Sequence, residues 1–405
     1  MIKNRNCPVC NSGEYEKIEK INFLLFEEHP ISKGYDLVQC KKCSFMYAEV
    51  QVSQIELDQY YSNISKYEDK QISTGGGYNI YDKERLEGVA KYLSKLFPDK
   101  NIKIADVGCA IGGLLEQLKK LGFENITGID PSKSCVEITK NEKGIDCIHS
   151  SLFDLNESFG IYDLIIISHV WEHILDLETA MSSLEKILSP NGFIYIECPN
   201  AMNYKNTIHA PLQELNTEHI NHFYEKGFLN YFGLRDYNCI DIGNKIVKIA
   251  SGEDYDALYG VFQKSSIKLN YKIQFDHDIQ GSLLEYIKKS KIWLEKIIHK
   301  IEFELANESN VIIYGVGQFA FKLLYEIVNK RPDLNIILFD NNSLNVGKDI
   351  SKFKINKGAD LDKYLINEKI KIIITSLIHQ NSIMQNINKI MTEKNITQVE
   401  IIELK

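Results

Sequence analysis

Short apolar runs that alternate with helical patterns constrain the fold of this chain more than any other feature. In the first part of the chain these runs lie at 103–107, 126–129, 162–167 and 192–197. They return later at 311–314, 335–339 and 370–375. Strands separated by helices favour parallel sheets that helices cover on both faces. We therefore predict an α/β protein with a doubly wound, Rossmann-like core and a second, smaller Rossmann-like unit after it in the chain.

The composition is that of an acidic globular chain. Its 405 residues are 44 % apolar and 25 % charged, which excludes a mostly disordered chain or a coiled-coil rod. Lysine and arginine number 47 against 55 for aspartate and glutamate, a net charge of −8, so nucleic acid is not expected as a partner. No stretch reaches the roughly 18 to 20 apolar residues of a membrane span, and the N-terminus lacks the apolar core of an export signal. We expect a cytoplasmic protein without a membrane partner.

Four of the nine cysteines form two Cys-x-x-Cys pairs near the N-terminus. Each pair can direct two thiolates at one ion, and four thiolates complete the closed tetrahedron of a structural zinc site. Four unrelated reduced cysteines would not explain two matched pairs, and a redox pair normally opens a helix within a thioredoxin-type unit. We therefore predict a structural Zn²⁺ held by Cys7, Cys10, Cys40 and Cys43.

The cysteine pairs and the two α/β patterns divide the chain into blocks. Apolar residues at helical spacing between 277 and 306 predict one or two long helices between the two α/β patterns. We expect a zinc-binding module over 1–70, a cofactor-binding core over 71–255, a helical connector over 256–306 and a C-terminal Rossmann-like domain over 307–405.

A glycine-rich turn joins the first strand of the core to its first helix. Gly108 and Gly112 follow Asp106 there, and glycines let backbone N–H groups and the chain itself approach a ligand closely. A second acid, Asp130, closes the next strand, where a carboxylate suits a ribose diol. The turn and the acid together predict a nucleoside site at the carboxyl edge of the sheet. A Gly-x-Gly-x-x-Gly dinucleotide motif is absent, because position 110 is alanine.

These motifs resemble those of the class I S-adenosylmethionine-dependent methyltransferases. The run from Tyr162 to His173 and the turn at Gly192 are similar to later motifs of that family. The resemblance covers about residues 80–240 and implies S-adenosylmethionine as cofactor. It implies that Asp106 faces the methionine amino group and that Asp130 holds the ribose. The remaining cofactor contacts are expected from Gly108, Cys109, Gly112, Ser151, Leu152 and His169.

A carboxylate and two imidazoles follow the last predicted strand of the core. Glu218 and His219 are adjacent, and His222 comes three residues later. Methyl transfer to a hydroxyl or an enolisable carbon is helped by a base with a near-neutral pKa, which histidine supplies. We predict that His219 is the catalytic base and that Glu218 orients it. Each of the two imidazoles also fits an ordinary packing role.

The three-part layout adds a second resemblance, to the zinc-containing sugar C-methyltransferases that act on nucleotide-linked 4-keto sugars. It implies a nucleotide-linked sugar as substrate, carbon methylation through an enolate, and a chain that can work as a monomer. That family has a tyrosine two residues before the glutamate, where this chain has Asn216. The Glu-His-x-x-His-Phe form is also similar to glycan methyltransferases that act on oxygen. Sugar O-methylation is therefore one alternative, and RNA methylation or a scaffold with a relic cofactor site are two others.

A second glycine-rich turn follows the first strand of the C-terminal block. Gly315, Gly317 and Ala320 match a Gly-x-Gly-x-x-Ala pattern, and Asp340 closes the next strand. Alone, this pattern is typical of dinucleotide binding. In the resembled architecture the domain instead helps to hold the nucleotide-linked sugar. A purely structural domain is the third interpretation.

Overall fold

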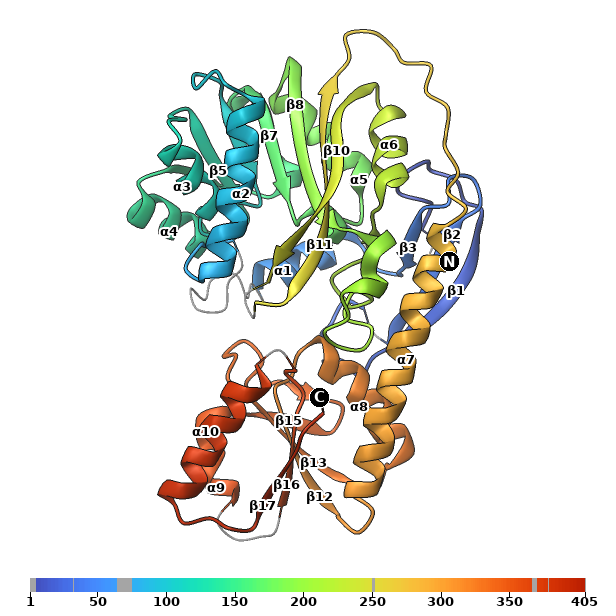
Figure 1. Ribbon diagram of the computed structural model, residues 1–405, viewed down its shortest axis with the longest axis vertical. Coiled ribbons are helices and arrows are strands. Elements are labelled where there is room, and N and C mark those ends of the chain that lie inside the picture. Colours follow the sequence, from blue (N-terminus) through green and yellow to red (C-terminus); the bar gives the residue numbers. More distant parts are fainter. Residues whose placement is uncertain are drawn as a thin grey trace. The chain divides into compact units, whose positions relative to one another are not determined.

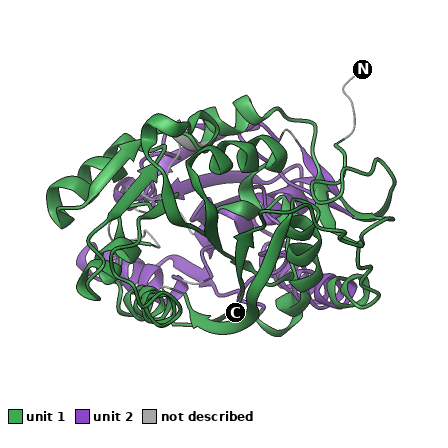
Figure 2. Cartoon of the chain, turned by 90° about the horizontal axis from the view of Figure 1, so that it is seen from above, with its two compact units in different colours: residues 1–18, 37–207, 218–283 green, residues 19–36, 208–217, 284–405 purple. Residues whose placement is uncertain are grey.

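The computed structural model describes residues 5–31, 33–63, 75–249, 252–365, 370–377 and 379–404. The chain forms two compact units, which Figure 2 shows in different colours. The first consists of residues 1–18, 37–207 and 218–283, and the second of residues 19–36, 208–217 and 284–405. The boundary that we expected between residues 70 and 71 lies outside the described residues.

The first unit contains a seven-stranded sheet in the order β10-β11-β8-β7-β4-β5-β6 (Figure 1). Its strands are β4 (Ile104–Val107), β5 (Ile126–Asp130), β6 (Asp146–His149), β7 (Tyr162–Ser168), β8 (Leu188–Pro199), β10 (Tyr237–Lys248) and β11 (Asp254–Lys264). The strands from β8 to β6 run parallel, while β11 is antiparallel to both β8 and β10. The chain order reverses direction across the sheet at β4 and β7, so β4 lies at the switch point where such sheets bind ligands.

Helices cover both faces of this sheet. Neighbouring side chains on a strand point to opposite faces, and here apolar side chains on both faces are buried under helices. Val261 of β11 belongs to the apolar core that α2 (Ile80–Leu96), α3 (Gly113–Lys120) and α4 (Lys133–Lys143) form on one face. The next residue, Phe262, stacks on Phe232 of the opposite layer with ring centroids 3.9 Å apart. Phe232 belongs to α6 (Glu225–Gly233), and Tyr231 of the same helix donates a hydrogen bond to α5 (Leu177–Ile187).

A four-stranded sheet carries the cysteine pairs. Its order is β1 (Tyr15–Asn22), β2 (Gly34–Cys40), β3 (Met46–Glu49) and β9 (Asn221–His222), and α1 (Gln54–Asn63) follows β3 in the chain. In the antiparallel register of β3 and β9, Met46 lies opposite His222. A strand that comes more than 170 residues after the cysteine module therefore completes its sheet.

The C-terminal residues form a second α/β fold with a six-stranded sheet. The strand order is β14-β15-β13-β12-β16-β17, parallel except for β14. The strands are β12 (Asn310–Tyr314), β13 (Asn335–Asp340), β14 (Asp349–Ile350), β15 (Phe353–Lys357), β16 (Ile370–Ile374) and β17 (Val399–Ile402). The helices are α7 (Ile279–Glu304), α8 (Gln318–Lys330), α9 (Asp362–Leu365) and α10 (Gln380–Glu393).

Five short 3₁₀ helices occur in the described part of the chain. They are η2 (Leu152–Asp154), η3 (Glu157–Phe159), η4 (Trp171–His173), η5 (Ala201–Asn206) and η6 (Gly358–Asp360). Among the described residues, no helix is both long enough and apolar enough to cross a membrane.

The predicted alternation of strands and helices is confirmed, and two details differ. The stretch from 277 to 306 is a single helix, α7. The boundary expected at residue 255 falls inside β11, which pairs with β8 over seven residues. We missed β11, and β10 before it, because a hairpin rather than a helix joins them, which breaks the alternation; β11 lies antiparallel between β10 and β8.

Candidate active site

The turn between β4 and α3 runs through three residues in the left-handed region. The φ angles of Gly108, Ala110 and Gly112 are 79°, 47° and 74°. A Cβ on Gly108 would lie 2.5 Å from Cγ2 of Val170, so only glycine fits there. Ala110 is small but does carry a Cβ, and its positive φ requires support from its surroundings.

Asp130 supplies that support. Its Oδ2 accepts a 2.8 Å hydrogen bond from the backbone N–H of Ala110, and its Oδ1 accepts one of 2.8 Å from Ser132. The N–H groups of Gly108 and Cys109 both donate to the backbone oxygen of Ile129, one residue earlier. The turn is thus tied to the end of β5, and the predicted ribose ligand is placed directly beside the predicted cofactor loop.

Asp106, at the beginning of this turn, is a buried carboxyl group that is 4 % exposed. Burial, together with the negative charge of Asp130, raises the pKa of Asp106 to about 7. A carboxylate in that position would gain from a nearby cation such as the amino group of a bound amino acid. The role that the resemblance implies for Asp106 stays a prediction.

The other predicted cofactor residues differ in whether their side chain or only their backbone is available to a ligand. The Cys109 side chain points into the core, with Sγ 3.6 Å from Sγ of Cys147, so only its backbone is available at the turn. Ser151 caps η2 by accepting a hydrogen bond from the N–H of Phe153, and Leu152 is buried. Ser150 donates its N–H to the backbone oxygen of Asp130, which brings this segment to the end of β5.

His169 follows β7 and joins two buried carboxylates. Its φ angle is 56°, and its Nδ1 and Nε2 lie 3.4 Å from Oε1 of Glu172 and 3.3 Å from Oε1 of Glu197. Burial alone would lower the pKa of His169, but the two carboxylates outweigh it and raise the pKa to about 9. Lys245 also contacts Glu197, at 2.8 Å, so both His169 and Lys245 compensate the negative charge of Glu197.

The segment that carries Glu218 and His219 is held against η4 by backbone and side-chain contacts. The N–H of Ile220 donates to the backbone oxygen of Glu172 at 3.0 Å. Nδ1 of His173 lies 3.0 Å from the backbone oxygen of Glu218, and because a carbonyl only accepts, Nδ1 carries the hydrogen. Asn221 donates through its side-chain amide to the backbone oxygens of Trp171 and Ile174.

These contacts bring one carboxylate and two imidazoles together. One ligand atom from each of Glu172, His173 and His219 lies within 4.8 Å of the other two. The rings of His173 and His219 are edge to face with centroids 5.0 Å apart. The structure therefore brings Glu172 to His219, a residue that our sequence analysis missed because 47 residues separate the two. Glu218 meets His173 through its backbone oxygen.

His222, the second imidazole of the predicted cluster, has a different environment. It is fully buried in the β3–β9 pairing, and its ring lies edge to face with Tyr204. Burial, together with the nearby His219 and Arg5, lowers the pKa of His222 to about 3. A histidine that stays neutral and buried serves packing, which is the plainer of the two roles we considered.

The four predicted metal ligands converge in the first unit. One sulfur from each of Cys7, Cys10, Cys40 and Cys43 lies within 4.8 Å of the other three. The Cys7–Cys43 and Cys10–Cys40 sulfur pairs are each 3.5 Å apart. A tetrahedral zinc ion with Zn–S bonds of about 2.3 Å needs sulfurs about 3.8 Å apart. The donor set and its spacing therefore fit zinc.

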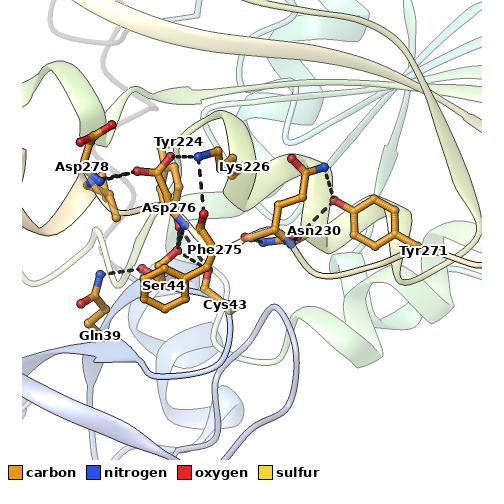
Figure 3. Close-up of polar contacts among 12 residues, drawn as sticks. Gln39, Cys43, Ser44, Tyr224, Lys226, Asn230, Tyr271, Phe275, Asp276 and Asp278 are labelled. Carbon is orange, nitrogen blue, oxygen red and sulfur yellow. Dashed lines mark hydrogen bonds and ion pairs between the residues drawn. The ribbon is translucent and has the colours of Figure 1, made fainter.

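The turn that carries two of these cysteines is anchored to the core residues around it (Figure 3). Ser44 follows Cys43, and its Oγ lies 2.8 Å from Oη of Tyr224 and accepts a 2.8 Å hydrogen bond from the N–H of Asp276. Gln39 donates to the backbone oxygen of Ser44. Asp276 in turn pairs with Lys226 at 3.0 Å.

In the second unit, the turn after β12 repeats the pattern of the turn between β4 and α3 in the first unit. Oδ2 of Asp340 accepts hydrogen bonds from the N–H of Val316 and the side chain of Asn345, and Oδ1 accepts one from the N–H of Asn342. Gly315 has a φ of 93°, while a Cβ on Gly317 would meet nothing within 4 Å. An acid that closes the second strand ties the first loop in both units.

Comparison with known families identifies the central part of the chain. Residues 81–242 match the family model described as "Methyltransferase domain". This segment is a methyltransferase domain. It is of the S-adenosylmethionine-dependent class, and the order of the seven strands, with β11 as the antiparallel one, is that of the class I fold.

The relatives of this methyltransferase domain share only part of their length with the chain. A mitochondrial ubiquinone biosynthesis O-methyltransferase of Rattus norvegicus is 31 % identical over 112 residues, which are 25 % of this chain and 32 % of that protein. A ubiquinone biosynthesis O-methyltransferase of Pelagibacter ubique is 33 % identical over 30 % of this chain and 51 % of that protein. The N-methyltransferase NodS of Bradyrhizobium japonicum is a similar solved structure, with a TM-score of 0.38, 14 % identity and coverage of 53 % of this chain and 98 % of that one. The chain thus spans about a third to a half of the curated relatives above.

Proposed function

We propose that this methyltransferase acts on a nucleotide-linked sugar. The observation that carries the proposal is the placement, in one unit, of a glycine-rich loop tied to Asp130 and a Glu172–His173–His219 cluster in which the carboxylate is buried and the imidazoles are partly exposed. The loop suits S-adenosylmethionine, and the cluster suits an acceptor whose proton must leave. The second glycine-rich turn, tied to Asp340, supports a substrate that carries a nucleotide.

The reaction that we propose for a 4-keto sugar is carbon methylation through an enolate. The His219 cluster takes the acidic proton from the carbon beside the ketone, and in the simplest form the imidazole of His219 is the base, with Glu218 orienting it. The enolate carbon then attacks the methyl group of S-adenosylmethionine. The S–CH₃ bond breaks as the new C–C bond forms, and S-adenosylhomocysteine leaves. The protein contributes the in-line placement of the two reactants and the base.

Sugar O-methylation is the second candidate, and two observations favour it. Asn216 stands where the resembled carbon methyltransferases have tyrosine. Several relatives are named O-methyltransferases, although their names refer to ubiquinone biosynthesis. In that version the same cluster deprotonates a hydroxyl, and the alkoxide attacks the methyl group. RNA methylation is the weakest candidate, since a net charge of −8 opposes binding to a polyanion.

We also propose that Cys7, Cys10, Cys40 and Cys43 hold a structural zinc ion. Four thiolates leave no open position on a tetrahedral ion, so this zinc would stabilise the fold of the cysteine module rather than take part in methyl transfer. Its effect on the reaction would be indirect, through the β3–β9 pairing that lies next to His219.

Mass spectrometry of a nucleotide-sugar pool, incubated with the enzyme and S-adenosylmethionine in deuterated water, tests the proposal. One added methyl group, together with deuterium uptake beside the ketone in the absence of cofactor, is the result expected for carbon methylation. A methyl group without that exchange would establish the oxygen version. No methylated member of the pool, from an enzyme that binds S-adenosylhomocysteine, would contradict a nucleotide-sugar substrate.

A further inference from the structure

His173 contacts Glu218 through one ring nitrogen and lies near the carboxylate of Glu172 with the other. The backbone oxygen of Glu218 fixes the hydrogen on Nδ1, so Nε2 is the nitrogen with the lone pair. Nε2 lies 3.9 Å from Oε1 of Glu172, which is too long for a hydrogen bond. Metal-bound histidines commonly show this arrangement, in which one nitrogen donates to a carbonyl and the other faces the ion.

Glu172 is the buried anion of this cluster. Glu172 is 1 % exposed, and its Oε2 has no hydrogen-bond partner in the described structure. A buried carboxylate is costly unless positive charge compensates it. Three imidazoles surround it, those of His169, His173 and His219, and a divalent cation would compensate it more completely.

We propose that Glu172, His173 and His219 bind a divalent transition-metal ion. Two imidazole nitrogens and one carboxylate oxygen, with no thiolate among the three, suit zinc, cobalt, nickel or ferrous iron. This site is chemically distinct from the four-cysteine cluster, which presents only sulfur. Three protein ligands leave at least one coordination position for water or an acceptor oxygen, as in catalytic rather than structural metal sites.

This proposal rests on the proposed function for the position of the acceptor, and it refines one step. With an ion bound, His219 would be a ligand, and a water on the open coordination position, after losing a proton to solvent, would take the acceptor proton in its place as hydroxide. The hydroxide becomes water, the acceptor anion forms a bond to the methyl carbon, and the S–CH₃ bond electrons return to sulfur. The same residues therefore remain essential, but the immediate base differs.

Cobalt titration of the full-length protein, with its cysteine site first loaded with zinc, tests this site without measuring activity. We expect one Co²⁺ per chain with visible absorption bands that lack the intense thiolate charge-transfer bands. Glu172→Gln and His173→Ala should each weaken the binding of Co²⁺ at least about 100-fold. His299→Ala, which removes an exposed histidine, is the matched control and should bind cobalt as the native protein does.

Binding of S-adenosylhomocysteine, measured on the same samples, separates this proposal from the proposed function. Retained cofactor affinity in Glu172→Gln, with cobalt binding lost, would support the metal site because the variant is then folded. No cobalt binding by the native protein, or equal binding by Glu172→Gln and the native protein, would overturn the metal site and leave the proposed methyltransferase activity in place. Loss of cobalt binding in His299→Ala would also overturn it.

Discussion

Nδ1 of His173 lies 3.0 Å from the backbone oxygen of Glu218, and this contact joins two segments that are 45 residues apart in the chain. One segment follows β7 and carries His169 and Glu172. The other leads into β9 and carries His219. Because β9 pairs with β3, the position of His219 depends on the cysteine module as well as on the methyltransferase sheet.

Removal of zinc should therefore affect turnover more than cofactor binding. We expect Cys40→Ser to abolish zinc binding at the cysteine cluster, to lower the thermal stability of the protein and to reduce turnover at least about tenfold, because losing a structural metal unfolds small metal-dependent modules. S-adenosylhomocysteine affinity should change less than about threefold, as Asp130 and the glycine-rich turn lie in another sheet. Zinc content, thermal melts and calorimetric titration check this. Cys239→Ser, at an exposed cysteine, is the control.

The affinity for the cofactor should depend on the carboxylate of Asp130 and not on that of Asp340. Asp130→Asn keeps the shape but replaces one acceptor oxygen by an NH₂ group, so either Ala110 or Ser132 loses its hydrogen-bond acceptor. We expect the affinity for S-adenosylhomocysteine to fall about 10- to 100-fold, or about 1.4 to 2.8 kcal/mol. Asp340→Asn makes the same change in the second unit and should leave that affinity unaltered. Equal losses in both variants would contradict the assignment.

The pH dependence of cofactor binding should report the ionisation of Asp106. Its pKa in the free protein is raised to about 7, chiefly by burial, so the carboxyl group is largely protonated below that pH. The cationic amino group of S-adenosylhomocysteine favours the carboxylate. We therefore expect the affinity to fall as the pH drops below 7, by at most about tenfold per pH unit. Calorimetric titrations at several pH values check this, and Asp106→Asn should remove the dependence. An unchanged slope in that variant would assign the titration to another group.

Lys322 should make the second unit more stable at alkaline pH. Burial lowers the pKa of Lys322 to about 7, while its amine donates to the backbone oxygen of Leu212 at 2.6 Å. Between about pH 7 and 10 the unfolded chain holds a proton that the native protein does not, so the free energy of unfolding rises with pH, by at most about 1.4 kcal/mol per unit. Lys322→Met should lack this rise. Urea unfolding at pH 7 and pH 9 measures it, with Lys389→Met at an exposed lysine as the control.

The glycine-rich loop proposed to bind the cofactor could be predicted because its signals are local. A strand that begins at Ile104, two glycines with positive φ and the acid Asp130 one strand later lie within 27 residues, and each has a backbone reason to be there. The cysteine cluster was predictable for a similar reason, since matched spacing restricts where four thiolates can meet.

The acceptor side of the site could be predicted only in part. His219 stood out in the sequence, but the carboxylate beside it is Glu172, which the fold brings there from another loop. The sequence order favoured its neighbour Glu218 instead. The strand β11 was missed because it follows β10 through a hairpin, and its other partner, β8, lies about 60 residues earlier. A sequence pattern shows which residues are neighbours along the chain, whereas these pairings depend on the packing of distant segments.

The most direct test of this account is methyl transfer from labelled S-adenosylmethionine to nucleotide-linked 4-keto sugars, with the native enzyme and His219→Ala side by side. We predict a labelled sugar product with the native enzyme, and turnover reduced at least about 100-fold in His219→Ala with S-adenosylhomocysteine affinity nearly unchanged. Turnover at the native rate in His219→Ala, or no labelled sugar from a native enzyme that binds the cofactor, would contradict the account.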